Sequence, residues 1–112
     1  MTFIATGHEH VLARDGTRRG GPDAVIEVRS PEDETYEKFP FFAGLGVRQV
    51  IVVHRDTKDV EVYRLAGPQY VALQADADGW LRSDVLGVRF MRTAAGRLLI
   101  EEVDTPANRI EI

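Results

Sequence analysis

The sequence predicts a mixed α/β (α+β) fold in which a β-α-β unit is followed by an antiparallel meander. Two segments indicate the unit: residues 24–29 alternate in polarity, and residues 47–54 are an almost continuous β-branched run, with a helical pattern between them. Short apolar segments separated by turn residues follow and indicate the meander. With 112 residues, 44% of them hydrophobic and 29% charged, the chain has the composition of one soluble globular domain.

The N-terminal part contains the first predicted strands. Residues 11–14 suggest a short strand that runs into a turn at Asp15-Gly16, and residues 24–29 form the next strand. In that second strand the apolar residues 24, 26 and 28 face one side, and the mixed set faces the other: Val25, Glu27 and Arg29. We therefore expect Glu27 and Arg29 to share one face of the sheet.

The segment after this strand carries the signals of a helix. Ser30 and Pro31, followed by acidic residues, are typical of a helix start, and Gly46 is suited to the residue just after a helix. Pro40 interrupts the pattern, because it lacks an N–H and clashes with the preceding turn. Either the helix kinks at Pro40, or its regular part begins only near Glu37.

The remaining elements are predicted as strands. Residues 47–54 read as a strand buried on both faces and parallel to residues 24–29, with a right-handed crossover between them. Further strands are expected at residues 60–65, 70–74, 85–91 and 98–103, and the last residues are a tail or an edge strand. Trp80 and the phenylalanines 39, 41 and 42 are interpreted as core.

Charge and composition limit the classes of function. The net charge is -4, whereas proteins that bind DNA without sequence preference usually cluster Lys and Arg. A cluster of Arg14, Arg18 and Arg19 is either a local basic patch or the solvated rim of a hairpin. The absence of cysteine excludes thiol catalysis and thiolate metal sites, and no apolar stretch is long enough for a signal peptide or membrane helix. We expect a cytoplasmic protein that has no membrane partner.

Glu27 is the residue with the clearest potential for chemistry. A carboxylate in mid-strand is costly to bury unless it is paired or holds a cation. Arg29 lies two residues further along the same face, and this acid-x-base spacing occurs in nucleases that bind Mg²⁺ through the acid. The same spacing also arises in a simple ion pair, so the two readings stay open on spacing alone.

The wider pattern resembles the Uma-two family of the PD-(D/E)XK nuclease superfamily. The resemblance rests on an ordered set of motifs and covers roughly residues 3–87: Pro22-Asp23, Glu27-Val28-Arg29-Ser30-Pro31, Glu34 with Glu37-Lys38, Gly46-Val47, the apolar strand, Arg55-Asp56, and the hairpin around residues 60–71. It implies a restriction-endonuclease-like mixed β-sheet and an Mg²⁺-dependent endonuclease that acts on DNA.

The resemblance also implies roles for individual residues. Glu27 matches a metal ligand and Lys38 a helix-borne base or phosphate contact, while Arg29 is a weaker catalytic candidate and Asp23 a weaker metal ligand. Asp23 and Glu27 are about 13 Å apart along an extended strand, which is too far for both to reach one Mg²⁺ easily. The family's metal-binding aspartate belongs to an earlier Pro-Asp pair on the neighbouring strand, before the residues that resemble Phe3–His10.

Two hypotheses follow from the sequence. In the first, the chain is an Mg²⁺-dependent endonuclease with Glu27, Lys38 and Arg29 at its site. In the second, it is a catalytically silent nuclease-fold module that serves in dimerisation or partner binding. Both assume that residues 1–112 form a single domain, without the family's N-terminal helix and first catalytic strand, and both allow a homodimer.

Three weaker metal-binding signals remain in the sequence. His8 and His10 share a face if extended, but two ligands are too few for a transition-metal site. Asp76-Ala77-Asp78-Gly79 begins like a calcium loop, but Gly87 stands where the loop needs a bidentate glutamate. His54 ends the buried strand, either at the surface or near Glu27.

Overall fold

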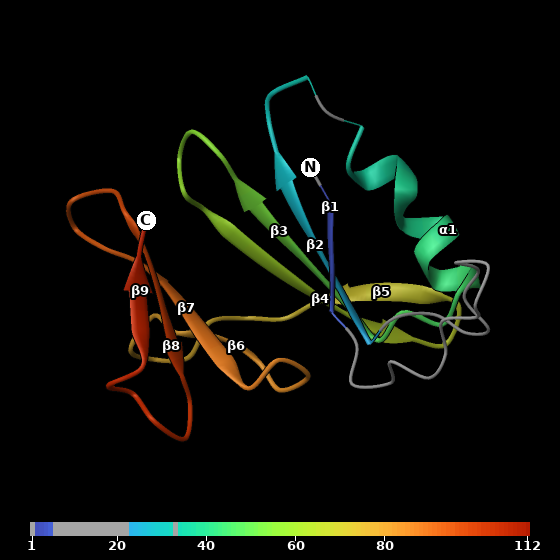
Figure 1. Cartoon of the computed structure of the whole chain (residues 1–112). Coiled ribbons are helices and arrows are strands. Elements are labelled where there is room, and N and C mark those ends of the chain that lie inside the picture. Colours follow the sequence, from blue (N-terminus) through green and yellow to red (C-terminus); the bar gives the residue numbers. More distant parts are fainter. Residues whose placement is uncertain (1, 6–22, 33) are drawn as a thin grey trace, which may run out of the picture.

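The computed structural model describes residues 2–5, 23–32 and 34–112, and for residues 2–5 it describes the backbone. The predicted strand at residues 11–14, the arginine cluster of residues 14, 18 and 19, and the histidine pair of residues 8 and 10 lie outside the described residues. Figure 1 shows the described elements and their order along the chain.

The larger sheet contains the predicted β-α-β unit. Its strands lie side by side in sequence order: β1 (Thr2–Ala5), β2 (Ala24–Arg29), β3 (Gln49–His54), β4 (Val60–Ala66) and β5 (Gln69–Ala72). β2 and β3 are parallel, and the other neighbours are antiparallel. The structure therefore confirms the parallel pair and the meander that follows it.

A second, four-stranded sheet continues the chain. It contains β6 (Leu81–Ser83), β7 (Val88–Arg92), β8 (Leu98–Glu102) and β9 (Arg109–Glu111), all antiparallel. The strand predicted from residue 85 begins only at Val88, because Gly87 stands at a positive φ of 69° and its N–H closes a turn onto Ser83. The last residues form an edge strand, which is one of the two predicted alternatives.

The helical segment begins later than Ser30 and Pro31 suggested. Residues 31 and 32 form a turn, a 3-10 helix (η2) covers Tyr36–Lys38, and α1 covers Phe39–Gly44. Pro40 lies in the first turn of α1, where its missing N–H would have no partner in any helix. Of the two alternatives, the structure supports a regular part that begins near Glu37.

The end of α1 is set by Gly46. This glycine has a positive φ of 74°, its N–H donates to the Ala43 carbonyl at 3.0 Å, and the Val47 N–H donates to the Phe42 carbonyl at 3.1 Å. These two bonds form a Schellman motif, which uses carbonyls that the helix leaves free. Phe42 and Val47 also pack in one apolar cluster, so the motif aims the chain into β3.

The five-stranded sheet lies between the helical segment and the second sheet (Figure 1). On the helix side, Val25, Val50 and Val52 pack against Phe42 and Val47. On the other side, the core is formed by buried residues of both sheets: Ala24, Ile51, Val53, Val62, Leu81, Phe90 and Leu98. The predicted alternation of β2 is confirmed, since Ala24 and Val25 belong to opposite clusters.

Two of the predicted core aromatics are placed differently. Phe42 is buried, but Phe41, its neighbour in α1, is 67% exposed. Trp80 is only half-buried, and the Arg89 guanidinium stacks on its ring at 3.9 Å from the centroid. Among the described helices, none is long and apolar enough to cross a membrane.

Candidate functional site

The candidate site lies on the helix side of the larger sheet, where it spans the central parts of β2, β3 and β4. Glu27 of β2 lies opposite Val52 of β3, and Val52 lies opposite Glu61 of β4, so one row crosses the sheet. Arg29 and His54 form the next row toward the carboxyl ends of the parallel strands. The alternation of each strand points these side chains to the face that η2 and α1 cover.

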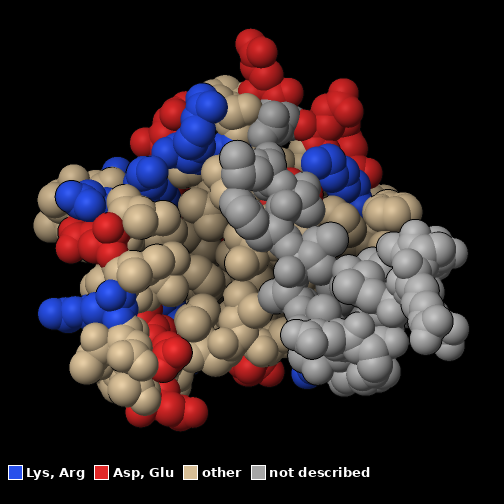
Figure 2. Space-filling view, viewed as in Figure 1, with Lys and Arg blue, Asp and Glu red and all other residues tan. Residues whose placement is uncertain are grey.

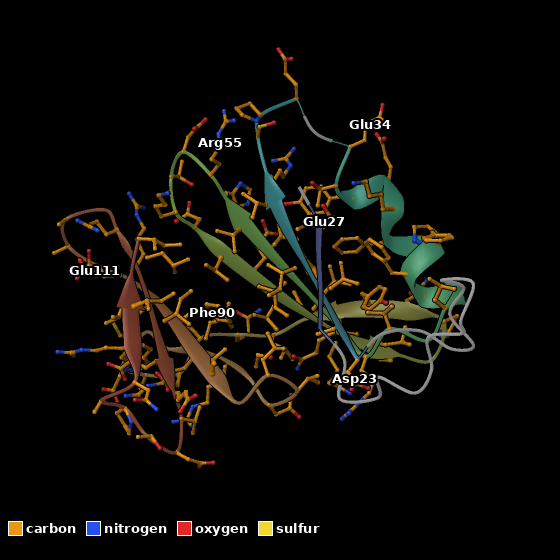
Figure 3. The ribbon with its side chains drawn as sticks, in the orientation of Figure 1. Asp23, Glu27, Glu34, Arg55, Phe90 and Glu111 are labelled. Atoms are coloured by element: carbon orange, nitrogen blue, oxygen red, sulfur yellow. The ribbon has the colours of Figure 1, made fainter. Side chains whose placement is uncertain are left out.

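Glu27 is a buried acid beside a lysine. Its side chain is 1% exposed, and its Oε1 lies 3.5 Å from Nζ of Lys38, whose side chain is 47% exposed. Because a buried carboxylate is costly without a compensating charge, this contact is favourable. The structure thus brings Glu27, labelled in Figure 3, together with Lys38, although Glu27 comes from β2 and Lys38 from η2.

Arg29 takes a different position on the same face. Its guanidinium lies over the Tyr36 ring, 5.0 Å from the ring centroid. Its Nε is buried, and the described residues offer it no hydrogen-bond acceptor. Arg29 also lines a small pocket of about 230 Å³ together with Ser30, His54 and Thr57 at the ends of β2 and β3. It lies next to the Glu27–Lys38 pair and is linked to it through η2.

The Glu61 carboxylate lies at the centre of a group of hydrogen-bonded polar side chains. His54 Nε2 lies 2.5 Å from Glu61 Oε2, and the Tyr36 hydroxyl donates to the same oxygen at 2.7 Å. The Tyr63 hydroxyl donates to Oε1. The carboxylate therefore joins β3, β4 and the 3-10 helix that carries Lys38. We call Tyr36, His54, Glu61 and Tyr63 the Glu61 cluster.

These contacts shift the pKa values of the cluster in opposite directions. Burial raises the pKa of Glu61, but hydrogen bonds from His54, Tyr63 and Tyr36 outweigh it and hold the pKa below the ordinary 4.5. Burial and the hydrogen bond to Glu61 raise the pKa of Tyr36 to about 12 and also raise that of Tyr63. At neutral pH the cluster therefore holds an ionised carboxylate and two neutral phenols.

Asp23 does not join Glu27. It precedes the first residue of β2, and its backbone carbonyl accepts a hydrogen bond from the Gln49 N–H at 3.3 Å. Figure 3 places Asp23 at one end of the strand and Glu27 further along it toward the helical segment. The roughly 13 Å expected from the extended geometry of β2 agrees with this placement. The structure thus groups Glu27 with Lys38 and leaves Asp23 apart.

The carboxylate of Glu27 is the type of ligand that Mg²⁺ prefers. This ion takes oxygen ligands, keeps several waters, and is often held by one or two carboxylates together with substrate phosphates. Glu27 supplies one such carboxylate. Within residues 23–32 and 34–112, His, Cys, Asp and Glu side chains do not form a group of three that could hold a metal. The donor chemistry fits Mg²⁺, with one protein acid from these residues.

The sequence reasoning missed the Glu61 cluster. In β4, Glu61 and Tyr63 alternate with apolar residues, so their shared face was visible in the pattern. The contact with His54 depends on the register of β3 and β4, and the contact with Tyr36 depends on the position of η2. Neither the register nor that position is encoded in a local pattern.

The charge on the surface is mixed. On the face shown in Figure 2, Lys and Arg side chains lie among Asp and Glu side chains and do not gather into one basic patch. This agrees with the net charge of -4. Contacts to a polyanion from the described residues would therefore be local, at side chains such as Lys38 and Arg29.

Comparison with known proteins identifies one family. A family model described as "Uma2: Putative restriction endonuclease" matches residues 3–95, which include every strand from β2 to β7 and the whole candidate site. No curated protein and no solved structure gave a significant match.

Proposed function

The chain belongs to the Uma2 family of putative restriction endonucleases, and on that premise we propose that it hydrolyses phosphodiester bonds of DNA with the help of Mg²⁺. The observation that carries the proposal is the pair of Glu27 and Lys38, an acid that is 1% exposed and an ammonium group 3.5 Å away. A buried carboxylate in mid-strand is costly to maintain, and together with Lys38 it supplies a negative and a positive charge of the kind that a phosphodiester site needs.

Each residue has a separate role in the proposal. Glu27 would hold the cation through its carboxylate, and Lys38 would contact the scissile phosphate as an ammonium group or, as the neutral amine, accept a proton from the attacking water. Arg29, which lines the pocket at the strand ends, would steady a neighbouring phosphate. When bound, Mg²⁺ supplies Lewis acidity at a phosphate oxygen. Asp23 stays a weaker metal-ligand prediction.

DNA as the partner, Mg²⁺ as the cofactor and the cytoplasm as the location are parts of the same proposal. Family membership supports DNA and a divalent metal in general. The absence of cysteine agrees with a reducing compartment. We also propose that residues 1–112 act as a single restriction-endonuclease-like domain, because residues of both sheets form one core.

Cation binding tests the role of Glu27 directly. We expect calorimetry to detect Mg²⁺ or Mn²⁺ binding to the wild-type protein, and Glu27→Gln to weaken it by about tenfold or more, because the substitution removes a charged oxygen ligand. The matched control is Glu37→Gln, an exposed acid next to Lys38 in η2. The control should bind the cation as the wild type does.

A DNA-cleavage assay distinguishes the role of Lys38 from that of Glu27. Lys38→Met should lower Mg²⁺-dependent nicking of plasmid DNA by about a hundredfold or more while cation binding persists, since a general base or phosphate contact typically contributes about 10²–10⁴ in rate. Far-UV circular dichroism checks that each variant is folded. Equal cation binding by wild type and Glu27→Gln would contradict the metal-site proposal.

The alternative is a catalytically silent nuclease-fold module for dimerisation or partner binding. One observation favours it: within residues 23–32 and 34–112, no three His, Cys, Asp or Glu side chains are grouped so that they could hold a metal. Wild-type protein that binds no divalent cation and cleaves no DNA would support this alternative.

A further inference from the structure

β9 is an edge strand of the second sheet, and what we infer from it does not depend on the proposed chemistry. In the order β6-β7-β8-β9, the strand has β8 on one side and no other described strand on the other. Its three residues, Arg109, Ile110 and Glu111, are all exposed. Figure 1 shows β9 along the margin of the molecule, away from the helical segment.

The backbone of β9 directs hydrogen-bonding groups outward at two residues. Leu98 and Ile112 exchange two N–H···O bonds of 2.9 Å, and the Glu102 N–H donates to the Asn108 carbonyl at 3.0 Å. An antiparallel ladder alternates between bonded and non-bonded pairs, so Arg109 and Glu111 turn their N–H and C=O groups away from β8. The outward Glu111 carbonyl also accepts a bond from Arg97 Nη2 at 3.2 Å, which leaves it a second lone pair.

The side chains of β9 complement a second copy of the same strand. If two copies pair antiparallel about Ile110, each Arg109 lies opposite Glu111 of the other copy. These are the two residues whose backbone groups point outward, so the charged pairs coincide with the hydrogen-bonded pairs. Opposite charges that face each other across strands are favourable, and like charges are unfavourable. Charge and backbone geometry thus select the same register.

The apolar residues of the strand agree with that register. Ile110 is 58% exposed and Ile112 is 50% exposed. Ile110 also lines a groove of about 380 Å³ with Val88 and Ile100, on the face of the second sheet that carries Phe90. Pairing about Ile110 brings the two grooves together and removes apolar surface of both copies from water.

β5, an edge strand of the larger sheet, lacks this complementarity. Its residues Gln69–Ala72 carry no charge, so nothing in its side chains selects a register. From these observations we propose that two copies of the chain form a symmetric dimer by antiparallel pairing of β9 with β9, centred on Ile110. The two four-stranded sheets then become one continuous sheet.

Disulfide trapping tests the register. The chain has no cysteine, so a single introduced cysteine reports on one position. In the proposed dimer the two copies of residue 110 form a non-hydrogen-bonded pair, with Cα atoms about 4.5 Å apart, within reach of a disulfide. The matched control is Ile112→Cys, on the same face and similarly exposed, whose two copies would stand about 13 Å apart.

We expect mild oxidation to convert Ile110→Cys into a covalent dimer and to leave Ile112→Cys monomeric on a non-reducing gel. Equal cross-linking of the two variants, or none in Ile110→Cys, would overturn the proposed register.

Sedimentation equilibrium tests the dimer without a covalent bond. Glu111→Pro removes an N–H that faces the second copy, and an edge strand tolerates proline at such a position. We expect the wild type to dimerise and Glu111→Pro to raise the dissociation constant by about tenfold or more, because two intermolecular hydrogen bonds and both Arg109–Glu111 pairs are lost. Trp80 fluorescence checks that the variant is folded. A wild type that is monomeric throughout the concentration range would overturn the proposal.

Discussion

At the scale of single residues, Glu61 shows how one carboxylate can organise a polar cluster. It accepts hydrogen bonds from the hydroxyls of Tyr36 and Tyr63 and pairs with His54. Tyr36 lies two residues before Lys38 in η2, so Glu61 ties the 3-10 helix to β4. We interpret Glu61 as a residue that positions Lys38 beside Glu27, without contact between Glu61 and Glu27 being required.

The pH dependence of stability tests this role of Glu61. Its pKa in the folded protein lies below the ordinary 4.5 because the hydrogen bonds to it outweigh burial. A lowered pKa adds stability above the unfolded-state pKa, and this stability is lost as the pH falls through the folded-state pKa. We expect Glu61→Gln to be less stable than wild type at pH 7 and the difference to shrink as the pH falls below about 4.5.

Urea denaturation at a series of pH values measures that difference in the free energy of unfolding. The control is Glu102→Gln, an exposed acid on β8 that is distant in the chain from the Glu61 cluster. A difference between wild type and Glu61→Gln that stays constant from pH 7 to pH 3 would show that the Glu61 charge does not contribute in this way.

At the scale of elements, the stability of the short helix α1 depends on the structure of its C-terminal end. α1 has six residues, too few for a helix to be stable by itself in water. It is held by Phe42 in the apolar cluster and by the Schellman motif at Gly46. The motif also sets the direction in which the chain enters β3, so the end of the helix positions a central strand.

Alanine at position 46 should therefore destabilise the protein. Gly46 has a φ of 74°, where an L side chain costs roughly 1–2 kcal/mol. Gly44 lies in α1, does not have a positive φ, and has open space around its Cβ position, so Gly44→Ala is the matched control. Chemical denaturation should show a loss of about that size for Gly46→Ala and no loss, or a small gain, for Gly44→Ala. Similar losses for both would argue against the role of the left-handed conformation.

At the scale of the whole molecule, a shared core joins the two sheets. Ile51 and Val62 of the larger sheet pack in one buried cluster with Leu81, Phe90 and Leu98 of the smaller one. Figure 3 shows Phe90 on the side of the smaller sheet that faces the larger sheet. Since neither sheet can bury this face by itself, we expect the two sheets to unfold together.

Phe90→Ala tests the coupling between the sheets. Phe90 is 4% exposed, and the loss of such a side chain costs about 3–5 kcal/mol. Phe41→Ala is the control, because Phe41 is 67% exposed and should change stability by less than about 0.5 kcal/mol. Unfolding is followed by fluorescence of Trp80, the single tryptophan, and by far-UV circular dichroism. A transition of Trp80 that shifts while the circular dichroism transition does not would show independent sheets.

The strands were predictable where the local pattern was strong. Ala24–Arg29 was predicted with the bounds that the structure shows, because the alternation agreed with the glycine and proline residues that flank it. The β-branched run gave β3, and the parallel pairing followed from the helix between the strands. Leu81–Ser83 was missed because three residues show no period. Phe41 was wrongly assigned to the core because large aromatic residues are usually buried, although it lies outside the helical spacing of Phe39 and Phe42.

The sequence by itself determined the fold class, the family and the position of Glu27 as a mid-strand acid on the mixed face of β2. These follow from local periodicity and from ordered motifs, which need no knowledge of distant contacts. Only the tertiary structure decided that Lys38 reaches Glu27 and that the side chains of His54, Tyr36 and Tyr63 come together at Glu61. The physical reason is that these side-chain contacts depend on the strand register and on the packing position of η2, and the core as a whole fixes both.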